Sequence, residues 1–263
     1  MILVPSNAQA IGAREEQEDS FGFSDPDDRE FMAHGGLLAV VADGMGGMAF
    51  GGEASRIAVS RFLDSYAAKT PAESVPNALL RCLNEGNDAV LAIADRYGMW
   101  DQIGTTMVCA VVGENTLHWI SVGDSRIYLV RSGTVIQITF DHVYANELDR
   151  RAALGEISEA EALSMPGREN LTSYLGKQTL TEIDRSLTPL PLEPGDLILI
   201  CSDGLYKAAS LQDLAAITQG EAGGITDALV QYALGLERPN QDNVTVLSIT
   251  CQTTGMQPVP NLG

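Results

Sequence analysis

The chain has 263 residues, of which 45% are hydrophobic and 19% are charged, so it is too apolar for a disordered protein and can bury a sizeable core. Its 35 acidic and 16 basic residues give a net charge of −19. That charge argues against nucleic acid or an anionic membrane surface as the main partner, because both are bound through basic surfaces. No apolar run approaches the roughly 20 residues that a membrane-spanning helix needs.

Seven segments are predicted to be β-strands, because they are short apolar or alternating runs bounded by Gly, Asp or Asn. They are residues 36–42, 105–112, 117–122, 126–131, 134–139, 196–201 and 244–250. The four middle strands are separated by short turns, which predicts an antiparallel meander, since parallel neighbours need long crossovers.

Apolar residues recur with helical spacing in four other segments. They are residues 53–68, 76–97, 210–218 and 224–236. Strand groups flanked by helices without regular βαβ alternation predict an α+β fold, in which two antiparallel sheets stack face to face with helices outside. We expect one domain over residues 1–252 and a loose tail over 253–263.

The polar segment 139–176 interrupts this order of strands and helices. It contains a capping-box pattern that begins at Ser158 and predicts a short helix, which Pro166 and Gly167 end. We interpret the segment as a flap over the surface. An ordinary connector is the alternative, but connectors of this length are usually functional or disordered.

The four cysteines include no Cys-x-x-Cys pair, and Cys109 and Cys201 lie inside apolar runs that are typical of buried positions. We therefore expect a reducing, cytoplasmic environment, and we expect the protein to be a monomer.

Four aspartates stand at the ends of predicted strands: Asp43, Asp124, Asp203 and Asp242. Taken singly, each is more simply explained as a turn residue, because Asp-Gly and Asp-Asn are common turn dipeptides. If the last two strands pair antiparallel, however, Asp203 lies beside Asp242, and Asp43 can join them at the same pole. Carboxylates gathered in this way repel each other unless a cation compensates.

The kind of cation follows from the ligands, because carboxylate oxygens without His or Cys favour Mg²⁺ or Mn²⁺ over Zn²⁺. Gly44 and the pair Gly46-Gly47 would let the chain turn sharply after the strand, with a backbone carbonyl free to approach the ion.

A second polar patch runs from Arg14 to Asp19. Glu18 and Asp19 offer further carboxylates, and the planar guanidinium of Arg14 suits a phosphate. The equally plausible alternative is a solvated charge run in which Arg14 pairs with a neighbouring glutamate.

Six motifs occur in the order of a known family. They are Arg14-x-x-Gln17-Glu18-Asp19-Ser20, Val41-Ala42-Asp43-Gly44-Met45-Gly46-Gly47, Gly104-Thr105-Thr106, Val122-Gly123-Asp124-Ser125-Arg126, Ser202-Asp203-Gly204-Leu205 and Asp242-Asn243-Val244-Thr245. Each motif is weak alone, but together they span nearly the whole chain. The sequence resembles the metal-dependent protein phosphatase family, of the protein phosphatase 2C type, in its bacterial form.

The resemblance implies a four-layer αββα fold with helix pairs outside a central β-sandwich and two Mn²⁺ or Mg²⁺ ions at one edge. It implies that Asp43 bridges both ions, that the Gly44 carbonyl binds one, and that Asp203 and Asp242 complete the first site. Glu18 or Asp19 would hold the second ion, largely through water. Asp124, together with Asp203, would hold a third and weaker one.

The implied chemistry is hydrolysis of phosphoserine and phosphothreonine in proteins by a water that bridges the two ions, with Arg14 holding the phosphate. The implied partners are phosphorylated proteins and a serine/threonine kinase whose action the enzyme opposes. Two rival functions are a catalytically silent phosphoprotein-binding domain of the same fold and a two-metal phosphoesterase for small molecules or nucleic acid. The intact set Asp43, Asp203 and Asp242 argues against the first, and the net charge argues against nucleic acid.

Several residues depart from the family pattern. Gln17 stands where Asn is usual, which questions a turn-holding hydrogen bond. Met45 stands where many eukaryotic relatives have a His proposed as general acid, so we assign no protein general acid and expect water in that role. Asp141 and His142 match a flap-start pattern, although Val143 replaces the usual Ser, and we interpret both as structural or flap-positioning.

Overall fold

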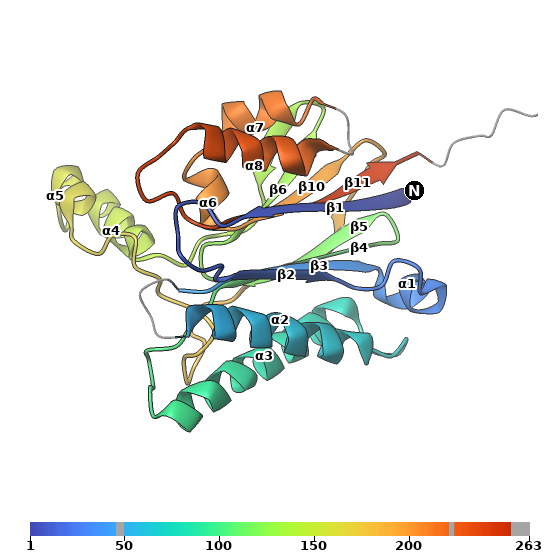
Figure 1. Cartoon of the computed structure of the whole chain (residues 1–263), viewed down its shortest axis with the longest axis horizontal. Helices are drawn as coiled ribbons and strands as arrows, with labels where there is room; N and C mark the ends of the chain where they lie inside the picture. Colours follow the sequence, from blue (N-terminus) through green and yellow to red (C-terminus); the bar gives the residue numbers. More distant parts are fainter. Residues whose placement is uncertain (46–49, 221–223, 254–263) are drawn as a thin grey trace, which may run out of the picture.

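The computed structural model describes residues 1–45, 50–220 and 224–253, and two antiparallel β-sheets stacked face to face form its centre (Figure 1). The five-stranded sheet has the order β1-β11-β10-β6-β7, and the six-stranded sheet has the order β2-β3-β4-β5-β8, with β9 also paired to β5. The strands are β1 (Ile2–Ala10), β2 (Asp19–Phe23), β3 (Leu37–Asp43), β4 (Met107–Gly113), β5 (Thr116–Val122), β6 (Arg126–Arg131), β7 (Thr134–Gln137), β8 (Asp184–Arg185), β9 (Leu190–Pro191), β10 (Leu197–Cys201) and β11 (Val244–Gln252).

Helices cover the outer face of each sheet, which confirms the predicted αββα layers (Figure 1). Helices α2 (Gly51–Ala67) and α3 (Val75–Tyr97) pack on the six-stranded sheet, and α7 (Leu211–Ile217) and α8 (Ile225–Gly235) pack on the five-stranded sheet. The other helices are α1 (Arg29–Gly35), α4 (Tyr144–Ala153), α5 (Glu159–Ser164) and α6 (Asp203–Tyr206). No helix in the described part of the chain is long and apolar enough to cross a bilayer.

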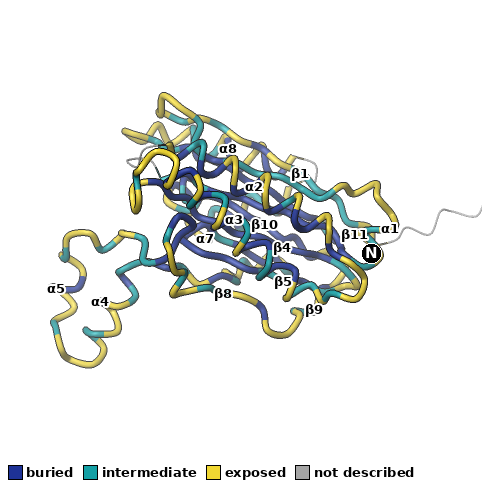
Figure 2. Tube along the Cα trace, turned by 90° about the horizontal axis from the view of Figure 1, so that it is seen from below, coloured by how far each residue is buried: buried dark blue, intermediate teal, exposed yellow. Residues whose placement is uncertain are grey.

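Strand β3 shows how the sequence builds these layers. Leu37, Ala39 and Val41 belong to the core between the two sheets, whereas Leu38 and Val40 belong to the core under α2 and α3. Side chains alternate between the faces of a strand, so a strand buried on both faces is a continuous apolar run. Figure 2 shows central strands such as β4 and β10 as buried along nearly their whole length.

The predicted four-strand meander is wrong at its centre. β4 pairs with β5, and β6 pairs with β7, but β5 and β6 belong to different sheets. The three-residue link between them crosses the sandwich at Gly123, where φ is +99° and a Cβ would lie 2.6 Å from Thr106 Cγ2. Both strands are largely apolar on both faces, so the sequence pattern does not tell which sheet each one joins.

Helices α4 and α5 project from the edge of the sandwich and are largely exposed (Figures 1 and 2). The predicted capping box at the start of α5 is present, because Ser158 Oγ accepts the Glu161 amide at 3.1 Å and the Glu161 carboxylate accepts the Ser158 amide at 2.8 Å. A bridge between Thr105 and Leu175 fastens the returning chain beside Gly44, which itself pairs with Thr105. Of the predicted tail, residues 254–263 lie outside the described residues.

Candidate active site

The strand ends bring the predicted aspartates to one end of the sandwich. Asp43 ends β3, and the residue opposite it in the β2–β3 pairing is Asp19. β10 and β11 pair antiparallel with Cys201 opposite Val246, which meets the condition set for Asp203 and Asp242 to approach, so Asp203 after β10 and Asp242 before β11 lie at the same edge. The structure therefore gathers side chains that are up to 223 positions apart in the sequence, from Asp19 to Asp242.

Asp43 is held through its backbone. Its amide donates to Thr106 Oγ1 at 2.9 Å, and its carbonyl accepts from Thr105 Oγ1 at 2.8 Å. Burial raises the pKa of its carboxyl well above the usual range, and the neighbouring charges of Asp19 and Asp203, then of Asp124 and Asp242, raise it further. The five carboxylates thus form one interacting group, which we call the acidic cluster.

Two oxygens of the acidic cluster are buried without a hydrogen-bond partner in the described part of the chain. Asp19, only 5% exposed, accepts from Ser202 Oγ at 2.7 Å and Thr245 Oγ1 at 2.6 Å through Oδ2, while its Oδ1 has no partner. Burial raises the pKa of Asp19 to about 6. Asp203 pairs with Lys207 through Oδ2, and its Oδ1 is likewise unpartnered.

Asp124 lies on the link that crosses between the sheets and is 8% exposed. Its Oδ2 accepts from the Tyr206 hydroxyl at 2.8 Å. Its pKa is raised to about 6 by burial and then by the charge of Asp203, which places Asp124 on the Asp203 side of the acidic cluster.

Arg14 pairs with Asp242, at 2.7 Å between Nη2 and Oδ2, so the alternative of a pair with a neighbouring glutamate is wrong. Asn243 fastens the Arg14 loop to β11: its Oδ1 accepts the Glu18 amide at 2.7 Å, and its Nδ2 donates to the Glu16 carbonyl at 3.1 Å. The Glu18 pKa is raised by burial, and the charges of Arg14 and Asp242 act on it in opposite directions. Glu18 therefore lies beside the Arg14–Asp242 pair.

The close approach of backbone around Gly44 requires glycine. A Cβ at Gly44 would lie 2.4 Å from the Gly51 carbonyl oxygen and 2.6 Å from that of Glu18. Gly46 and Gly47 lie outside the described residues. The hydrogen bond questioned at Gln17 is present, because Gln17 Oε1 accepts the Asp19 amide at 3.0 Å.

The residues present fit a hard divalent cation. In the described ranges no three Asp, Glu, His or Cys side chains stand close enough to hold an ion as they are oriented. Asp203, Asp242 and Asp124 each direct one oxygen to a neighbouring protein group. The unpartnered buried oxygens of Asp19 and Asp203 and the raised pKa of Asp43 are features that a bound cation would compensate. Oxygen ligands of this kind suit Mg²⁺ or Mn²⁺.

Sequence reasoning assigned no role to the groups that position the carboxylates. Ser202 and Thr245 hold Asp19, Tyr206 holds Asp124, and Lys207 pairs with Asp203. Ser202 and Thr245 stand in two of the six motifs, and Lys207 follows Asp203 by four residues, the spacing of a helical ion pair.

Asp141 and His142 have the structural contacts expected of them. Asp141 binds the Arg126 guanidinium, with 2.6 Å between Nη2 and Oδ2. His142 Nδ1 accepts the Gly123 amide at 3.0 Å, and burial lowers the pKa of this imidazole. Asp141 thus ties the start of segment 139–176 to β6, and His142 ties it to the link that carries Asp124.

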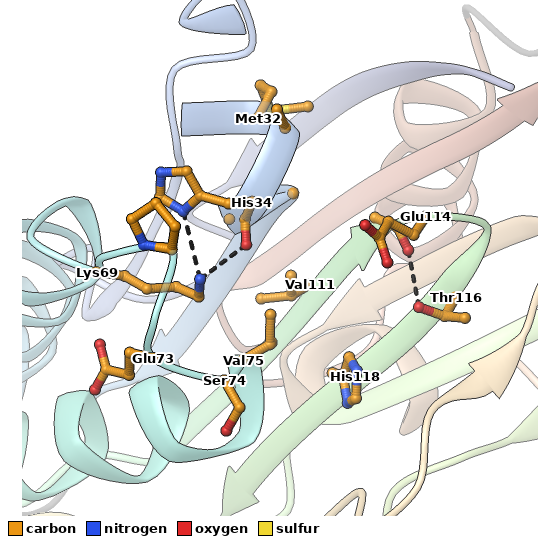
Figure 3. Close-up of a pocket in the computed structure, with 15 residues that line it drawn as sticks. Met32, His34, Lys69, Glu73, Ser74, Val75, Val111, Glu114, Thr116 and His118 are labelled. Carbon is orange, nitrogen blue, oxygen red and sulfur yellow. Dashed lines mark hydrogen bonds between the residues drawn. The ribbon is translucent and has the colours of Figure 1, made fainter. Parts of the chain in front are cut away.

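A cavity of about 290 Å³ lies at the other end of the sandwich, between the end of α1, the start of α3 and the β4–β5 hairpin (Figure 3). His34, Lys69 and His118 line it, and Lys69 donates to the His34 carbonyl at 2.8 Å. None of the acidic-cluster residues lines this cavity.

The chain matches known proteins over most of its length. A family model described as protein phosphatase 2C matches residues 10–232. The serine/threonine phosphatase stp of Listeria innocua serovar 6a is 30% identical over 239 residues, which cover 90% of each chain.

Two solved structures share the fold. A serine/threonine phosphatase of S. agalactiae has a TM-score of 0.80 and 27% identity, with 95% of this chain and 100% of that chain covered. The catalytic domain of the phosphatase PstP, solved in complex with 2 manganese ions, has a TM-score of 0.73 and 26% identity, with 95% and 99% covered. The family model matches most of this chain, and the motif residues lie at one edge of the sandwich. This chain therefore belongs to the protein phosphatase 2C family.

Proposed function

We propose that this protein is a Mn²⁺- or Mg²⁺-dependent phosphatase that removes phosphate from phosphoserine and phosphothreonine in proteins. The observation that carries the proposal is the acidic cluster beside Arg14, with two buried carboxylate oxygens left unpartnered. The serine/threonine phosphatases among its relatives support the substrate class.

Asp43, Asp203, Asp242 and the Gly44 carbonyl would hold one ion, with Asp43 shared, and Glu18 or Asp19 would help to hold a second. Asp124 with Asp203 would hold a third, weaker ion. The 2 manganese ions bound by PstP support the proposal of two such ions, and the third is proposed from Asp124 and Asp203 alone. Bound there, divalent cations would lower the pKa of a shared water so that it attacks phosphorus.

Arg14 is the residue that would bind the substrate phosphate. Its guanidinium is half-exposed at the rim of the acidic cluster, and one of its two terminal nitrogens bonds to Asp242. That contact orients the planar group and leaves further N–H donors for phosphate oxygens. Charge on those oxygens increases in phosphoryl transfer, so a fixed guanidinium favours the transition state over the bound substrate.

The cysteines are poorly suited to form a covalent intermediate at this site. All four cysteines are buried as free thiols, and burial raises the thiol pKa of Cys109 and Cys201, which opposes formation of a nucleophilic thiolate. Direct attack by water is the simpler route.

We expect a serine/threonine kinase as the opposing partner and the cytoplasm as the compartment. The alternative function, a silent phosphoprotein-binding domain, is not favoured.

The test is phosphate release from a phosphothreonine peptide with and without Mn²⁺ or Mg²⁺. We expect turnover only with the metal, and a fall in kcat of about 1,000-fold for Asp43→Asn, as expected when the main transition-state stabilisation is lost. Turnover of similar size in EDTA would reject the mechanism. Peptide binding without turnover at saturating Mn²⁺ would favour the silent domain, and faster release from a small phosphate ester than from the peptide would point to a metabolite.

A further inference from the structure

Two stacked aromatic rings stand beside the acidic cluster, outside every core. Phe50 and Tyr97 have ring centroids 4.5 Å apart and planes within 6° of parallel. They are 42% and 44% exposed, and neither belongs to a hydrophobic core formed by the described residues. We call them the aromatic pair. Rings that stack outside a core and keep this much exposed area leave apolar surface open to a ligand.

The aromatic pair adjoins the candidate active site through Gly51. Phe50 precedes Gly51, whose carbonyl oxygen lies 2.4 Å from the position of a Cβ on Gly44. A Cβ on Gly51 would lie 2.7 Å from Glu18 Oε1. Figure 1 shows the start of α2 and the end of α3, where these rings lie, at the same end of the molecule as α4 and α5.

The backbone at Phe50 gives no structural reason for an aromatic residue. Phe50 is the N-cap of α2 and adopts the left-handed conformation (φ 60°, ψ 30°) without a side-chain cap hydrogen bond. Asn, Asp, Ser or Gly suit a helix N-cap better, and a bulky residue in the left-handed region is strained. Such strain persists where the side chain serves function.

Charge indicates which side chain the aromatic pair receives. The chain has a net charge of −19, Glu53 follows Phe50 in the first turn of α2, and Asp101 follows Tyr97 closely. Asp95 and Arg96, which precede Tyr97, offset each other. A negative surface with open aromatic faces suits a cation, and the planar guanidinium of arginine stacks on rings better than the ammonium of lysine.

We propose that the aromatic pair binds an arginine side chain close in sequence to the phosphoserine or phosphothreonine of the substrate, and so selects basic phosphoprotein segments. The proposal rests on the proposed function, because the phosphate at Arg14 is what brings flanking residues over Phe50. Trp100, three residues after Tyr97, is also exposed, at 41%.

The experiment compares kcat/KM for phosphothreonine peptides whose flanking residues are arginine, leucine or glutamate. We expect wild type to prefer the arginine peptide to the leucine peptide about two- to five-fold, the range that an exposed cation–π contact supplies. Phe50→Asn and Tyr97→Ala should bring that ratio to about one. Leu187→Ala, which removes an exposed apolar side chain between β8 and β9, is the matched control and should keep the ratio.

Folding does not confound the result, because Asn is both a preferred N-cap and tolerant of the left-handed region, so Phe50→Asn should unfold no more readily than wild type. The proposal would be overturned if Phe50→Asn and Tyr97→Ala lowered kcat/KM equally on all three peptides. It would also be overturned if both variants kept the wild-type ratio of kcat/KM between the arginine and leucine peptides. Hydrolysis of a small aryl phosphate by wild type with Mn²⁺ tests the proposed function separately, since that substrate has no flanking residue to bind.

Discussion

Asp196 and Asp203 flank the same strand, β10, but among the described residues only the Asp196 carboxylate has hydrogen-bond partners for both of its oxygens. Asp196 is 1% exposed, and Arg131 donates to both of its oxygens, at 2.8 Å and 2.7 Å, while the Glu193 amide also donates at 2.7 Å. At the other end of the strand, Asp203 keeps a buried oxygen without a partner and adds its charge to Asp19, Asp43 and Asp124.

The difference separates the structural charge of Asp196 from the charge of Asp203, which we propose to be functional. A buried carboxylate that is fully hydrogen-bonded stabilises its own surroundings, whereas a group of unpaired carboxylates lowers stability unless a ligand supplies the missing charge. The Asp196 end also has the cavity of Figure 3, where Lys69 donates to backbone carbonyls. We expect the two ends to respond to substitution with opposite signs.

The largest effect on stability is expected at the Asp196 end. Asp196→Ala leaves the Arg131 guanidinium and the Glu193 amide without their acceptor, and should lower the free energy of unfolding by about 2 to 4 kcal/mol. Urea unfolding of both proteins measures this, with Asp196→Asn as the milder control. The kcat on a phosphopeptide should stay unchanged, and a loss of activity without a loss of stability would contradict the comparison.

The acidic cluster should show the opposite response. Mn²⁺ at about 100 times its Kd should raise the free energy of unfolding of wild type by about 2.7 kcal/mol. Asp203→Asn removes one of the repelling charges, so in EDTA it should be at least as stable as wild type, and Mn²⁺ should stabilise it far less. Urea unfolding in EDTA and in Mn²⁺ tests both points. A variant that unfolds more readily in EDTA would show that Asp203 is structural, like Asp196.

His142 allows a test by pH at the acidic-cluster end. Burial lowers its folded pKa, although Glu182 and Asp184 act in the opposite direction. Below about pH 6.5 the His142 imidazole therefore binds a proton in the unfolded chain but not in the folded protein. The free energy of unfolding consequently falls as the pH falls. Between pH 7.5 and pH 5.5, wild type should lose about 1 kcal/mol more than His142→Gln.

The difference between the two proteins is the measured quantity here, because the carboxylates titrate alike in both and cancel. Urea unfolding of both proteins in EDTA at pH 7.5 and pH 5.5 measures this difference in the loss of stability. An equal loss in wild type and His142→Gln would mean that the imidazole is protonated in the folded protein.

The smallest effect is expected from Gln17, which accepts the Asp19 amide. Gln17→Ala should cost about 1 kcal/mol of stability, the net value of one hydrogen bond, whereas Gln17→Asn should keep most of it. Thermal unfolding in EDTA compares the three proteins. If Asn is more stable than Gln, the longer side chain strains the turn before β2.

Prediction from sequence succeeded where a residue pattern is compatible with only one kind of structure. The apolar runs of β3, β4 and β10 are buried on both faces, and antiparallel pairing of β10 with β11 placed Asp203 beside Asp242. It failed at β1, an edge strand that contains Pro5 and is mostly half-buried, so its residues carry no clear alternation. Strand β2 and helices α1, α4 and α6 were also outside the predicted elements.

The site could be predicted only in part, for a related reason. Its aspartates follow apolar strands and are visible in the sequence, but the groups that fix them come from other elements. Asn243 binds the loop before β2, and Thr106 holds Asp43 from the start of β4, contacts that depend on sheet pairing. The limits of the flap, residues 139–176, stay a prediction.

Strand β11 has a consequence for how the protein matures. It is the last strand of the described chain, yet it lies between β1 and β10 in its sheet and brings Asp242 and Asn243 to the Arg14 loop. Pairings between such distant segments form late, after the loop-closure entropy has been overcome. A polypeptide whose synthesis has not yet passed β11 therefore lacks the contacts of Asp242 and Asn243 with the Arg14 loop, and the proposed site is incomplete until that strand is in place.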